Sequence, residues 1–443
     1  MMLEQKKSLY STWLVLTLCF VIMLAVINAV LFNVALADIS SELSIGPSQV
    51  SWIVVGYSMM VAIGSITYGK LADRFRVKSL LIIALVLFIV GSLIGFCFSS
   101  FAAVIIGRII QASGGSAFIS LSMISVARFL QPEKRPGALA MFSATIALAA
   151  GIGPLVGGVV THALGWRYLF LLMVIAIVAI ALLVKFMPKE EQQLSPASLP
   201  FDFAGAALLF GVIVAVLFAV NLNGLFFLLA LAFAFGFKWW LPRTSAPFVE
   251  RDLFANQAYL RLIGIGFLMN VGAMANMFLA PLYLIHVHKL SPFVVGLLLF
   301  MGGISGVLSS FASGKLLPRV GGGKIIFAAT VMMMTGFLAM GVIPQPGTIV
   351  VMILLLLTMM SYSAIQVALN NIVPRTLLPS KIGVGLGFYN LLNFVGMAFG
   401  PAAASRLFEK TGNYSLIFLG MAVVICLHFL LLAKPAAVQQ QSH

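Results

Sequence analysis

The chain has 443 residues, of which 62% are hydrophobic and only 8% are charged, and its mean hydropathy is +1.14. Such values exclude a water-soluble globular protein and indicate a polytopic membrane protein. The formal net charge of +15 does not indicate a nucleic-acid partner, because the Lys and Arg residues are spread over many segments and form no single basic face.

Apolar runs of about 20 residues, the length with which an α-helix crosses a bilayer, recur along the whole chain. We expect a first block of six spans, near 10–35, 50–70, 79–98, 101–127, 137–161 and 167–187. A polar linker at 188–202 precedes two spans near 203–222 and 225–242, and a second polar stretch occupies 243–257. Six further spans follow, near 258–286, 291–314, 324–343, 347–372, 382–405 and 413–433. The prediction is an all-α protein with fourteen transmembrane helices in three parts, 1–187, 188–257 and 258–443.

The distribution of cations predicts the orientation, since cytoplasmic loops are enriched in Lys and Arg. With the N-terminus inside, twenty-one of the 26 Lys and Arg residues fall in or beside cytoplasmic segments. Only four fall outside, Arg167, Lys289, Arg406 and Lys410. Both termini are therefore expected in the cytoplasm. The first apolar run is too long for a signal peptide and has no small-residue cleavage site, so we interpret it as a span.

The three cysteines, Cys19, Cys97 and Cys426, all lie within apolar runs and are interpreted as small core residues. We expect no disulfide, no metal and no cofactor.

Two sequence pairs indicate an internal repeat. Aligned without gaps, "GKLADRFRVKSLL" from Gly69 matches "GKLLPRVGGGKII" from Gly314, an offset of 245 residues. "GPLVGG" from Gly153 and "GPAAAS" from Gly400 are separated by 247. Two pairs at nearly the same offset predict two homologous six-span halves with two central spans inserted between them. Such repeats are typical of transporters, whose substrate site lies at the interface of the halves.

With these motifs the chain resembles, over its whole length, the major facilitator superfamily, and within it the fourteen-span drug:proton antiporters that include Gram-positive tetracycline and multidrug exporters. "GKLADRFRVK" at 69–78 is similar to the superfamily's loop motif, and "GRIIQASGGSA" at 107–117 to its span-four motif. "GIGPLVGG" at 151–158 is similar to the span-five motif of exporters, and "FNVALADIS" and "WIVVGY" resemble the fourteen-span group. The resemblance implies the major facilitator fold.

The loop motif is interpreted as a gate formed by Gly69, Asp73 and Arg74. Gly69 would let helices approach closely, and Asp73 would cap a neighbouring helix N-terminus and pair with a nearby Arg. The resemblance implies that these contacts lock the outward-facing state from the cytoplasmic side. The alternative is that the cluster of charges only sets the topology. Arg76 stands where the family usually has Gly.

In span five, Gly153, Pro154, Gly157 and Gly158 form the expected export motif. Proline removes a helix hydrogen bond and bends the axis, and small residues allow close helix contact. The resemblance implies that this segment closes the cavity between the halves and favours export. The alternative is a generic packing seam.

Arg108 is a charge within an expected span, which is costly and points to function. The resemblance implies a role in proton coupling, and Gln111 lies one turn away. The alternative is an Arg that extends to a polar rim.

Proton coupling usually needs a half-buried carboxylate that changes its protonation state. None of the eleven acidic residues falls in the middle of an expected span. Asn28 stands near the position where the exporters often have an acid in span one, and Pro318 replaces the acid of the second loop motif. The acid that tetracycline exporters carry in the late span has no counterpart, which disfavours tetracycline as the main substrate. Asp38, which matches a recurrent acid of the group, and Asp73 remain as candidates, with His286 and His288 as weaker ones.

The substrate pocket is expected from polar side chains that would be unfavourable facing lipid. Some of them would serve only as hydrogen bonds between helices. The predicted set is Asn28, Asn33, Tyr57, Gln111, Asn276, Tyr389, Asn390 and Asn393, and Asn270, Gln366 and Asn370 are further polar side chains of the same kind.

The sequence therefore predicts a monomeric exporter of lipophilic drugs in the bacterial cytoplasmic membrane, working by alternating access in exchange for protons. Its expected partners are a small-molecule drug, protons and lipid. A first alternative is a transporter of a specific metabolite or lipid that is not coupled through a carboxylate. An integral-membrane enzyme would need clustered His, Asp or a nucleophile with its base, and a channel would lack the motifs of the two halves.

Overall fold

The computed structural model describes residues 2–72, 75–188, 202–244, 249, 251–343, 346–378 and 382–432. Throughout these ranges the regular structure is helical, and they contain no strand. Thirteen helices in the described ranges are long and apolar enough to cross a membrane. The prediction of an all-α polytopic membrane protein is confirmed.

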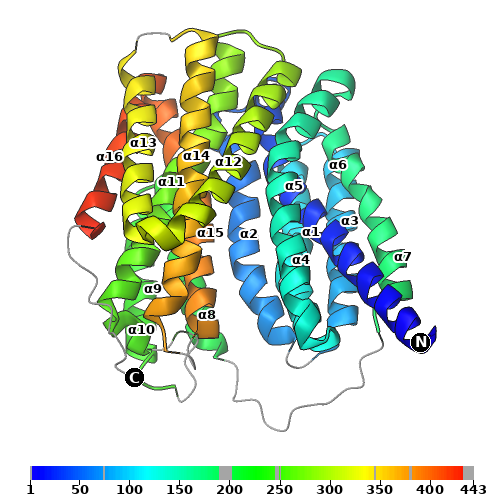
Figure 1. The fold of residues 1–443 in the computed structure, drawn as a ribbon. Coiled ribbons are helices and arrows are strands. Elements are labelled where there is room, and N and C mark those ends of the chain that lie inside the picture. The colour runs from blue at the N-terminus through cyan, green and yellow to red at the C-terminus, as the bar shows by residue number, and fades with distance from the viewer. Residues whose placement is uncertain are drawn as a thin grey trace. The chain divides into compact units, whose positions relative to one another are not determined.

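The chain divides into two compact units (Figure 1). The first takes in the described residues of Met1–Ile45, Trp52–Ser198 and Leu290–Phe300. The second takes in those of Gly46–Ser51, Leu199–Lys289 and Met301–His443. Helix α2 (Pro47–Leu71) therefore begins in the second unit and continues in the first, and α12 (Pro292–Val320) does the reverse.

Besides its part of α2, the first unit contains α1, the helices α3 to α7 and two 3-10 turns. Their bounds are α1 (Met2–Glu42), α3 (Val77–Cys97), α4 (Phe101–Phe129), η1 (Pro132–Lys134), α5 (Arg135–Leu164), α6 (Tyr168–Leu172), η2 (Met173–Ile175) and α7 (Ala176–Phe186). The predicted sixth span is thus two helices joined by the 3-10 turn η2 rather than one.

The second unit holds the central helices and the remaining spans. Their bounds are α8 (Phe203–Asn221), α9 (Phe226–Trp240), α10 (Arg251–Ala255), α11 (Gln257–His286), α13 (Gly322–Val342), α14 (Thr348–Ile372), η3 (Val373–Thr376), α15 (Ile382–Thr411) and α16 (Tyr414–Leu432).

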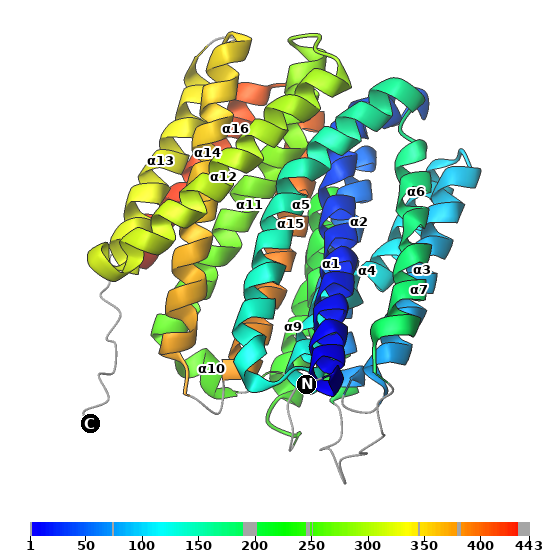
Figure 2. The same cartoon turned by 45° about the vertical axis from the view of Figure 1, so that its right-hand side comes forward.

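The same packing pattern recurs in both units. In the first, α1 packs along α5 and α3 along α4; in the second, α11 packs along α15 and α13 along α14. Figures 1 and 2 show α13 beside α14 and α3 beside α7. First-with-fifth and third-with-fourth pairing therefore recurs in each unit.

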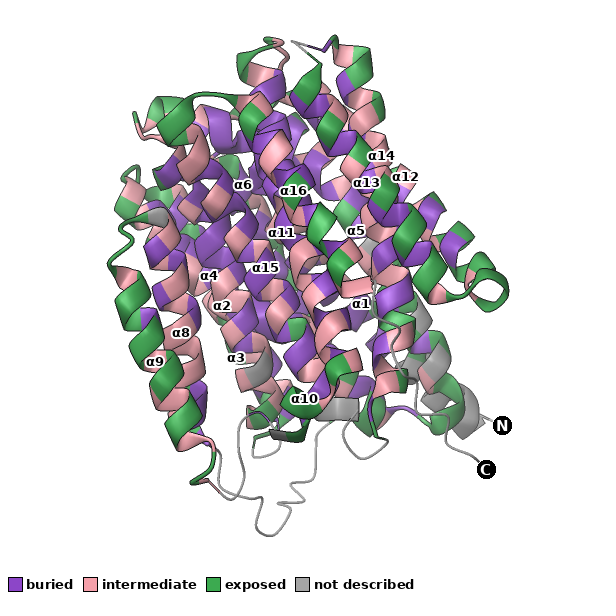
Figure 3. Cartoon of the chain, turned by 90° about the vertical axis from the view of Figure 1, so that its left-hand side faces the viewer, coloured by how far each residue is buried: buried purple, intermediate pink, exposed green. Residues whose placement is uncertain are grey.

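The central helices lie at the periphery of the second unit. α8 and α9 pack on each other, and α8 also contacts α15. In the most apolar stretch of α8 only 33% of the residues are buried, against 78% in that of α11. Figure 3 shows α9 as a largely exposed helix. α11 is therefore a core helix, while one side of the α8–α9 pair is left to the surroundings.

Two helix lengths differ from the expectation. α1 runs to Glu42, seven residues beyond the predicted end at 35, so Asp38 lies within a helix. α9 has 15 residues, or about 22 Å at 1.5 Å per residue, which is less than the roughly 30 Å of a hydrocarbon core.

Candidate functional site

Arg108 lies at the meeting point of four helices of the first unit. It is carried by α4, and its side chain is 0% exposed. α3 can approach α4 closely because glycines face each other: a Cβ on Gly107 would meet the backbone of Gly91 and Gly95 at 2.9 Å. A long cation is therefore held inside a tightly packed helix pair.

The guanidinium of Arg108 donates hydrogen bonds to three other residues. Nε donates to the Ile53 carbonyl of α2 at 3.2 Å. Nη1 faces the carbonyl oxygen and Oδ1 of Asn28 on α1, at 3.4 and 3.2 Å, and Gln111 Oε1 at 2.9 Å. Gln111 in turn donates from Nε2 to Ser92 Oγ of α3 at 2.8 Å. The cation thereby connects all four helices.

Two aromatic rings cover the guanidinium. Its carbon lies 4.3 Å from the ring centroid of Phe32 and 4.2 Å from that of Tyr57. Each ring face attracts a desolvated cation, by up to about 2 kcal/mol. Tyr57 donates to the Ala25 carbonyl at 3.4 Å, and Gly115 leaves room for its hydroxyl. We refer below to Asn28, Tyr57, Arg108 and Gln111, with Phe32 and Ser92, as the Arg108 cluster.

Some buried polar atoms of the cluster have no hydrogen-bond partner. Arg108 Nη2 and Asn28 Nδ2 are both buried without an acceptor. Farther along α1, Asn33 is 3% exposed and its Oδ1 lacks a donor. An unsatisfied buried polar group carries a desolvation penalty, which a hydrogen-bonding partner beside these atoms would remove.

The partners of Arg108 are all neutral. In the described part of the chain, Arg167 pairs with Glu42 and Arg406 with Glu409, at 2.6 and 2.7 Å. Asp38 is half-buried on α1, ten residues after Asn28 and hence about 15 Å along the axis, and it makes an interaction of its own. Arg108 and Asp38 are therefore not brought into contact in this structure.

The expected export motif lies on α5, where its glycines pack against two helices. A Cβ on Gly157 would come within 3.0 Å of the Leu31 carbonyl of α1, and one on Gly153 would meet Val30. A Cβ on Gly158 would lie 2.5 Å from the Pro292 carbonyl of α12, and Gly296 faces the Pro154 carbonyl at the same distance. α5 is in backbone contact with both α1 and the start of α12.

The expected gate is only partly described. Asp73 and Arg74 lie outside the described residues. At Gly69, no described atom lies within 4 Å of an added Cβ, so the close helix approach expected there is not found. Arg76 has φ −62°, an ordinary value for any residue, so the turn needs no glycine at that position. Arg128 of α4 donates to the Ala72 carbonyl at 2.7 Å, which ties α4 to the end of α2.

Polar residues of the second unit form a separate network between α11, α14 and α15. Asn270 Nδ2 donates to Asn393 Oδ1 at 3.2 Å, and Tyr362 donates to Asn270 Oδ1 at 3.4 Å. Tyr389 donates to Asn370 Oδ1 at 3.3 Å, and Gln366 Nε2 does so at the same distance.

The remaining predicted residues of that unit are dispersed. Asn276 donates to Thr358 at 3.2 Å, one helical turn or more from Asn270, and Asn390 is exposed on α15. His286 contacts Tyr414 at 3.4 Å, and His288 contacts Thr348 at 3.1 Å. The sequence predicts one pocket lined by eight residues. The structure brings only some of them together within each unit.

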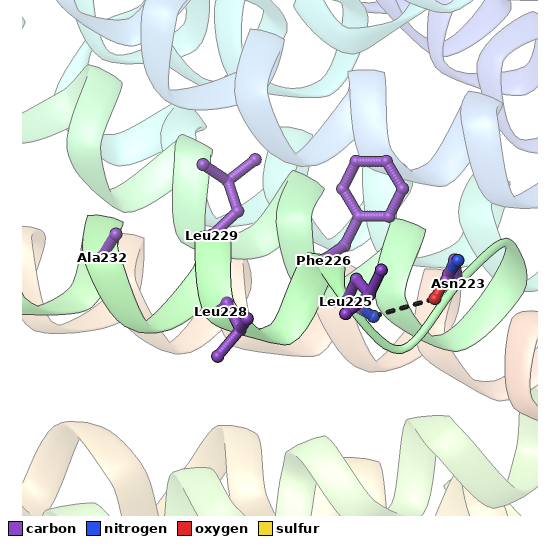
Figure 4. Close-up of a pocket in the computed structure, with 6 residues that line it drawn as sticks. All are labelled: Asn223, Leu225, Phe226, Leu228, Leu229 and Ala232. Carbon is purple, nitrogen blue, oxygen red and sulfur yellow. Dashed lines mark hydrogen bonds between the residues drawn. The ribbon is translucent and has the colours of Figure 1, made fainter.

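An open apolar hollow of about 560 Å³ lies over the start of α9, where Asn223 Oδ1 accepts a hydrogen bond from Leu225 N (Figure 4). None of the predicted substrate-binding residues lines it. Groups of three or more His, Cys, Asp or Glu that could hold a metal ion are absent from the described part of the chain.

Sequence reasoning missed three features of the first unit. Phe32 stands at the head of the segment "FNVALADIS", where an aromatic beside Asn33 was a usable signal. Ser92 follows a glycine in span three, and nothing in the sequence marks it. Glu42 accepts hydrogen bonds from the Trp166 indole and Arg167, both at 2.6 Å, which ties the end of α1 to the start of α6.

A chain of apolar helices in two similarly packed units, with a cation buried among neutral groups, defines a membrane transporter. The family model described as Major Facilitator Superfamily matches residues 18–401. The protein therefore belongs to the major facilitator superfamily.

Relatives and solved structures are consistent with that assignment. The chain is 25% identical over 421 residues to the riboflavin transporter RibZ of Clostridioides difficile (strain 630), covering 91% of this chain and 90% of that one. It is 26% identical to a multidrug resistance protein B homolog of Mycobacterium tuberculosis (strain H37Rv), covering 88% and 75%. A bacterial homologue of the human lysosomal transporter Spinster has the same fold, with TM-score 0.67, 12% identity and 96% coverage of each chain.

Proposed function

We propose that the protein is a secondary active exporter of lipophilic or amphiphilic drugs, working by alternating access in exchange for protons. The observation that carries the proposal is the glycine and proline segment of α5, which packs backbone to backbone on α1 and on the start of α12. In the fourteen-span drug:proton antiporters that the chain resembles, this segment favours export. The relative named as a multidrug resistance protein supports the same direction.

Fluoroquinolones and flat dyes are the first candidate substrates, and tetracyclines are a weaker candidate. The polar residues of the Arg108 cluster and of the second-unit network would contribute to binding, and the many Phe and Met residues suit varied apolar ligands. We place the protein in the bacterial cytoplasmic membrane as a monomer, with both termini in the cytoplasm.

For proton coupling, Asp38 is the candidate for the titrating group. Arg108 is a fixed cation in the same unit and would respond electrostatically to the charge on Asp38. Arg remains protonated in proteins, so Asp38 would exchange the proton, with Asp73 as the second candidate and His286 and His288 as weaker ones. Gly69, Asp73 and Arg74 would form the cytoplasmic gate. Export then depends on whether Asp38 is charged or neutral as the helices of the first unit rearrange.

Transport into proteoliposomes with an imposed pH gradient tests the proposal. Norfloxacin movement is followed for the native chain, Asp38→Asn and Arg108→Ala. We expect native transport to require the gradient, and Asp38→Asn to lose that requirement. If transport by the native protein does not depend on the pH gradient, the antiport proposal is wrong.

A second candidate is the export or uptake of a specific metabolite. The observation that favours it is the likeness to a riboflavin transporter over 91% of the chain, together with a protein interior in which the Arg108 cluster has only neutral partners. Riboflavin replaces norfloxacin in the same vesicles. Saturable riboflavin flux with no norfloxacin flux would favour this candidate over drug export.

A further inference from the structure

The Arg108 cluster holds donors that lack acceptors. Arg108 Nη1 is shared among three acceptor atoms, two on Asn28 and one on Gln111, whereas Nη2 has none. Asn28 Nδ2 also has none. Two side chains that are both 0% exposed thus keep free N–H groups beside a fixed positive charge.

The orientation of the Asn28 amide follows from its contact with Arg108. Asn28 Oδ1 lies 3.2 Å from Arg108 Nη1, which is only a donor. Turning the amide over would place N–H groups against N–H groups. The Asn28 Nδ2 group is therefore a donor held next to the guanidinium, and Gln111 is fixed in the same way by Arg108 and Ser92.

From this geometry we propose that Arg108 Nη2 and Asn28 Nδ2 bind the carboxylate of an amphiphilic substrate. The inference rests on the proposed export function and names the substrate class within it. An anion is the matching ligand because both groups only donate, and because charge-assisted hydrogen bonds between Arg and a carboxylate are stronger than neutral ones. A cationic ligand would be repelled by the same guanidinium.

Asp38 and Glu42, the two acids in the last turns of α1, do not supply this anion in the structure. Asp38 and Glu42 lie ten and fourteen residues beyond Asn28, about 15 and 21 Å along the helix. Glu42 is engaged by Trp166 and Arg167, and Asp38 has an interaction of its own. The hydrogen-bond partners of Arg108 are neutral, and we assign the carboxylate to the substrate.

The rings beside the guanidinium suit the apolar body of such a substrate. Phe32 and Tyr57 lie against Arg108 and are buried with it. Because Nη2 is closed to solvent here, the carboxylate binds in a conformation in which the Phe32 or Tyr57 side chain has moved aside. The displaced ring can then stack on a flat ligand.

Equilibrium binding of a matched fluorescent pair tests the proposal. Rhodamine 110 carries a free carboxylate, and rhodamine 123 is its methyl ester with the same ring system. Fluorescence polarisation gives the Kd of each for the purified full chain, for Arg108→Gln and for Asn28→Asp. Asn223→Asp, at the exposed α8–α9 turn, is the control for an equal change in charge.

We expect the native chain and Asn223→Asp to bind the acid about tenfold more tightly than the ester, which corresponds to 1.4 kcal/mol at 25 °C. Arg108→Gln should bring this ratio to about one. Asn28→Asp places a carboxylate of the protein on Arg108 and should reverse the preference toward the ester. Since Asn28→Asp is nearly isosteric, it tests the proposal even if Arg108→Gln unfolds.

A native chain that binds the ester as tightly as the acid overturns the inference and leaves drug export standing. If both cluster variants still bind the acid more tightly than the ester, the inference is also overturned, because another residue must then bind the carboxylate. If neither rhodamine binds, the inference fails together with the proposed binding of flat amphiphiles, whereas the norfloxacin flux assay judges export separately.

Discussion

At the residue scale, Gly157 is the position where a single methyl group should matter most to the packing of α5. A Cβ there would come within 3.0 Å of the Leu31 carbonyl, and the obstacle is backbone that cannot turn aside. We expect Gly157→Ala to lower the free energy of unfolding by about 1–3 kcal/mol, measured by SDS titration of the purified protein.

Gly137→Ala provides the matched control for this change. Gly137 lies on the same helix, and no described atom is within 4 Å of an added Cβ. Alanine is the better helix former, so stability should stay the same or rise by up to about 1 kcal/mol. Equal losses at 137 and 157 would show that the loss does not come from the contact with α1.

Several residues of the Arg108 cluster could be identified from the sequence. A cation in an apolar span is conspicuous, and Gln111 lies three residues on, which puts it on the same helix face. The contact of Arg108 with Phe32 and that of Gln111 with Ser92 could not be identified from the sequence. Both depend on the register and rotation of α1 and α3 against α4. Helix periodicity indicates which face is buried but not which residue of another helix meets it.

At the element scale, Asp202 joins the two central helices. Its Oδ1 accepts from Gly205 N at 2.8 Å, which caps the start of α8, and from the Trp240 indole at 2.7 Å, at the end of α9. We expect Asp202→Ala to lose both bonds and Trp240→Phe only the second, at about 1 kcal/mol per bond. Amide hydrogen exchange in the first turn of α8 should accelerate more in Asp202→Ala.

Trp239→Phe is the control for the indole. Trp239 is the neighbouring residue, is 53% exposed and stacks on Arg243 at 3.8 Å instead of contacting Asp202. Exchange in α8 should therefore keep its native rate. If Trp239→Phe and Trp240→Phe accelerate α8 equally, the effect belongs to the aromatic surface of α9 and not to the hydrogen bond.

Helix existence was easier to predict than helix ends. Every predicted span is helical in the described residues, because a long apolar run in lipid has no other way to satisfy its backbone. The ends depend on local contacts: α1 extends to Glu42, where the side chain meets Trp166 and Arg167. Apolar length gives no account of such polar contacts, so the predicted span ends near 35, whereas the helix continues past Asp38 to Glu42.

At the scale of the whole molecule, two of the cations expected on the outer side are paired with acids. Of the four Lys and Arg residues expected outside, Arg167 pairs with Glu42 and Arg406 with Glu409. Glu409 also accepts a hydrogen bond from Ser48 at 2.5 Å, within the second unit. These pairs leave the predicted orientation unchanged, because the positive-inside rule counts Lys and Arg and acidic residues contribute little to it.

Whether the number of transmembrane spans is odd or even depends on whether α9 crosses the membrane. Among the residues that the structure describes, thirteen helices are long enough to cross, an odd number that would leave the termini on opposite sides. α9 has 15 residues, yet residues 203–237 carry no charge, while Lys238 and Arg243 come at the end of the helix beside Trp239 and Trp240. An apolar helix with Trp, Lys and Arg at one end is typical of a transmembrane helix whose end lies at the cytoplasmic interface. Bilayer thinning at the shorter helix makes up the missing length.

We therefore expect α9 to cross, which single cysteines at Asn223 and Arg243 can establish in a chain whose three native cysteines are replaced. A membrane-impermeant maleimide added to intact cells should label position 223, and position 243 only after lysis. If both positions are labelled from the same side, α9 lies along the membrane surface, the chain has thirteen spans, and the two termini cannot both be cytoplasmic. A permeant maleimide that labels both positions confirms that each cysteine is reactive.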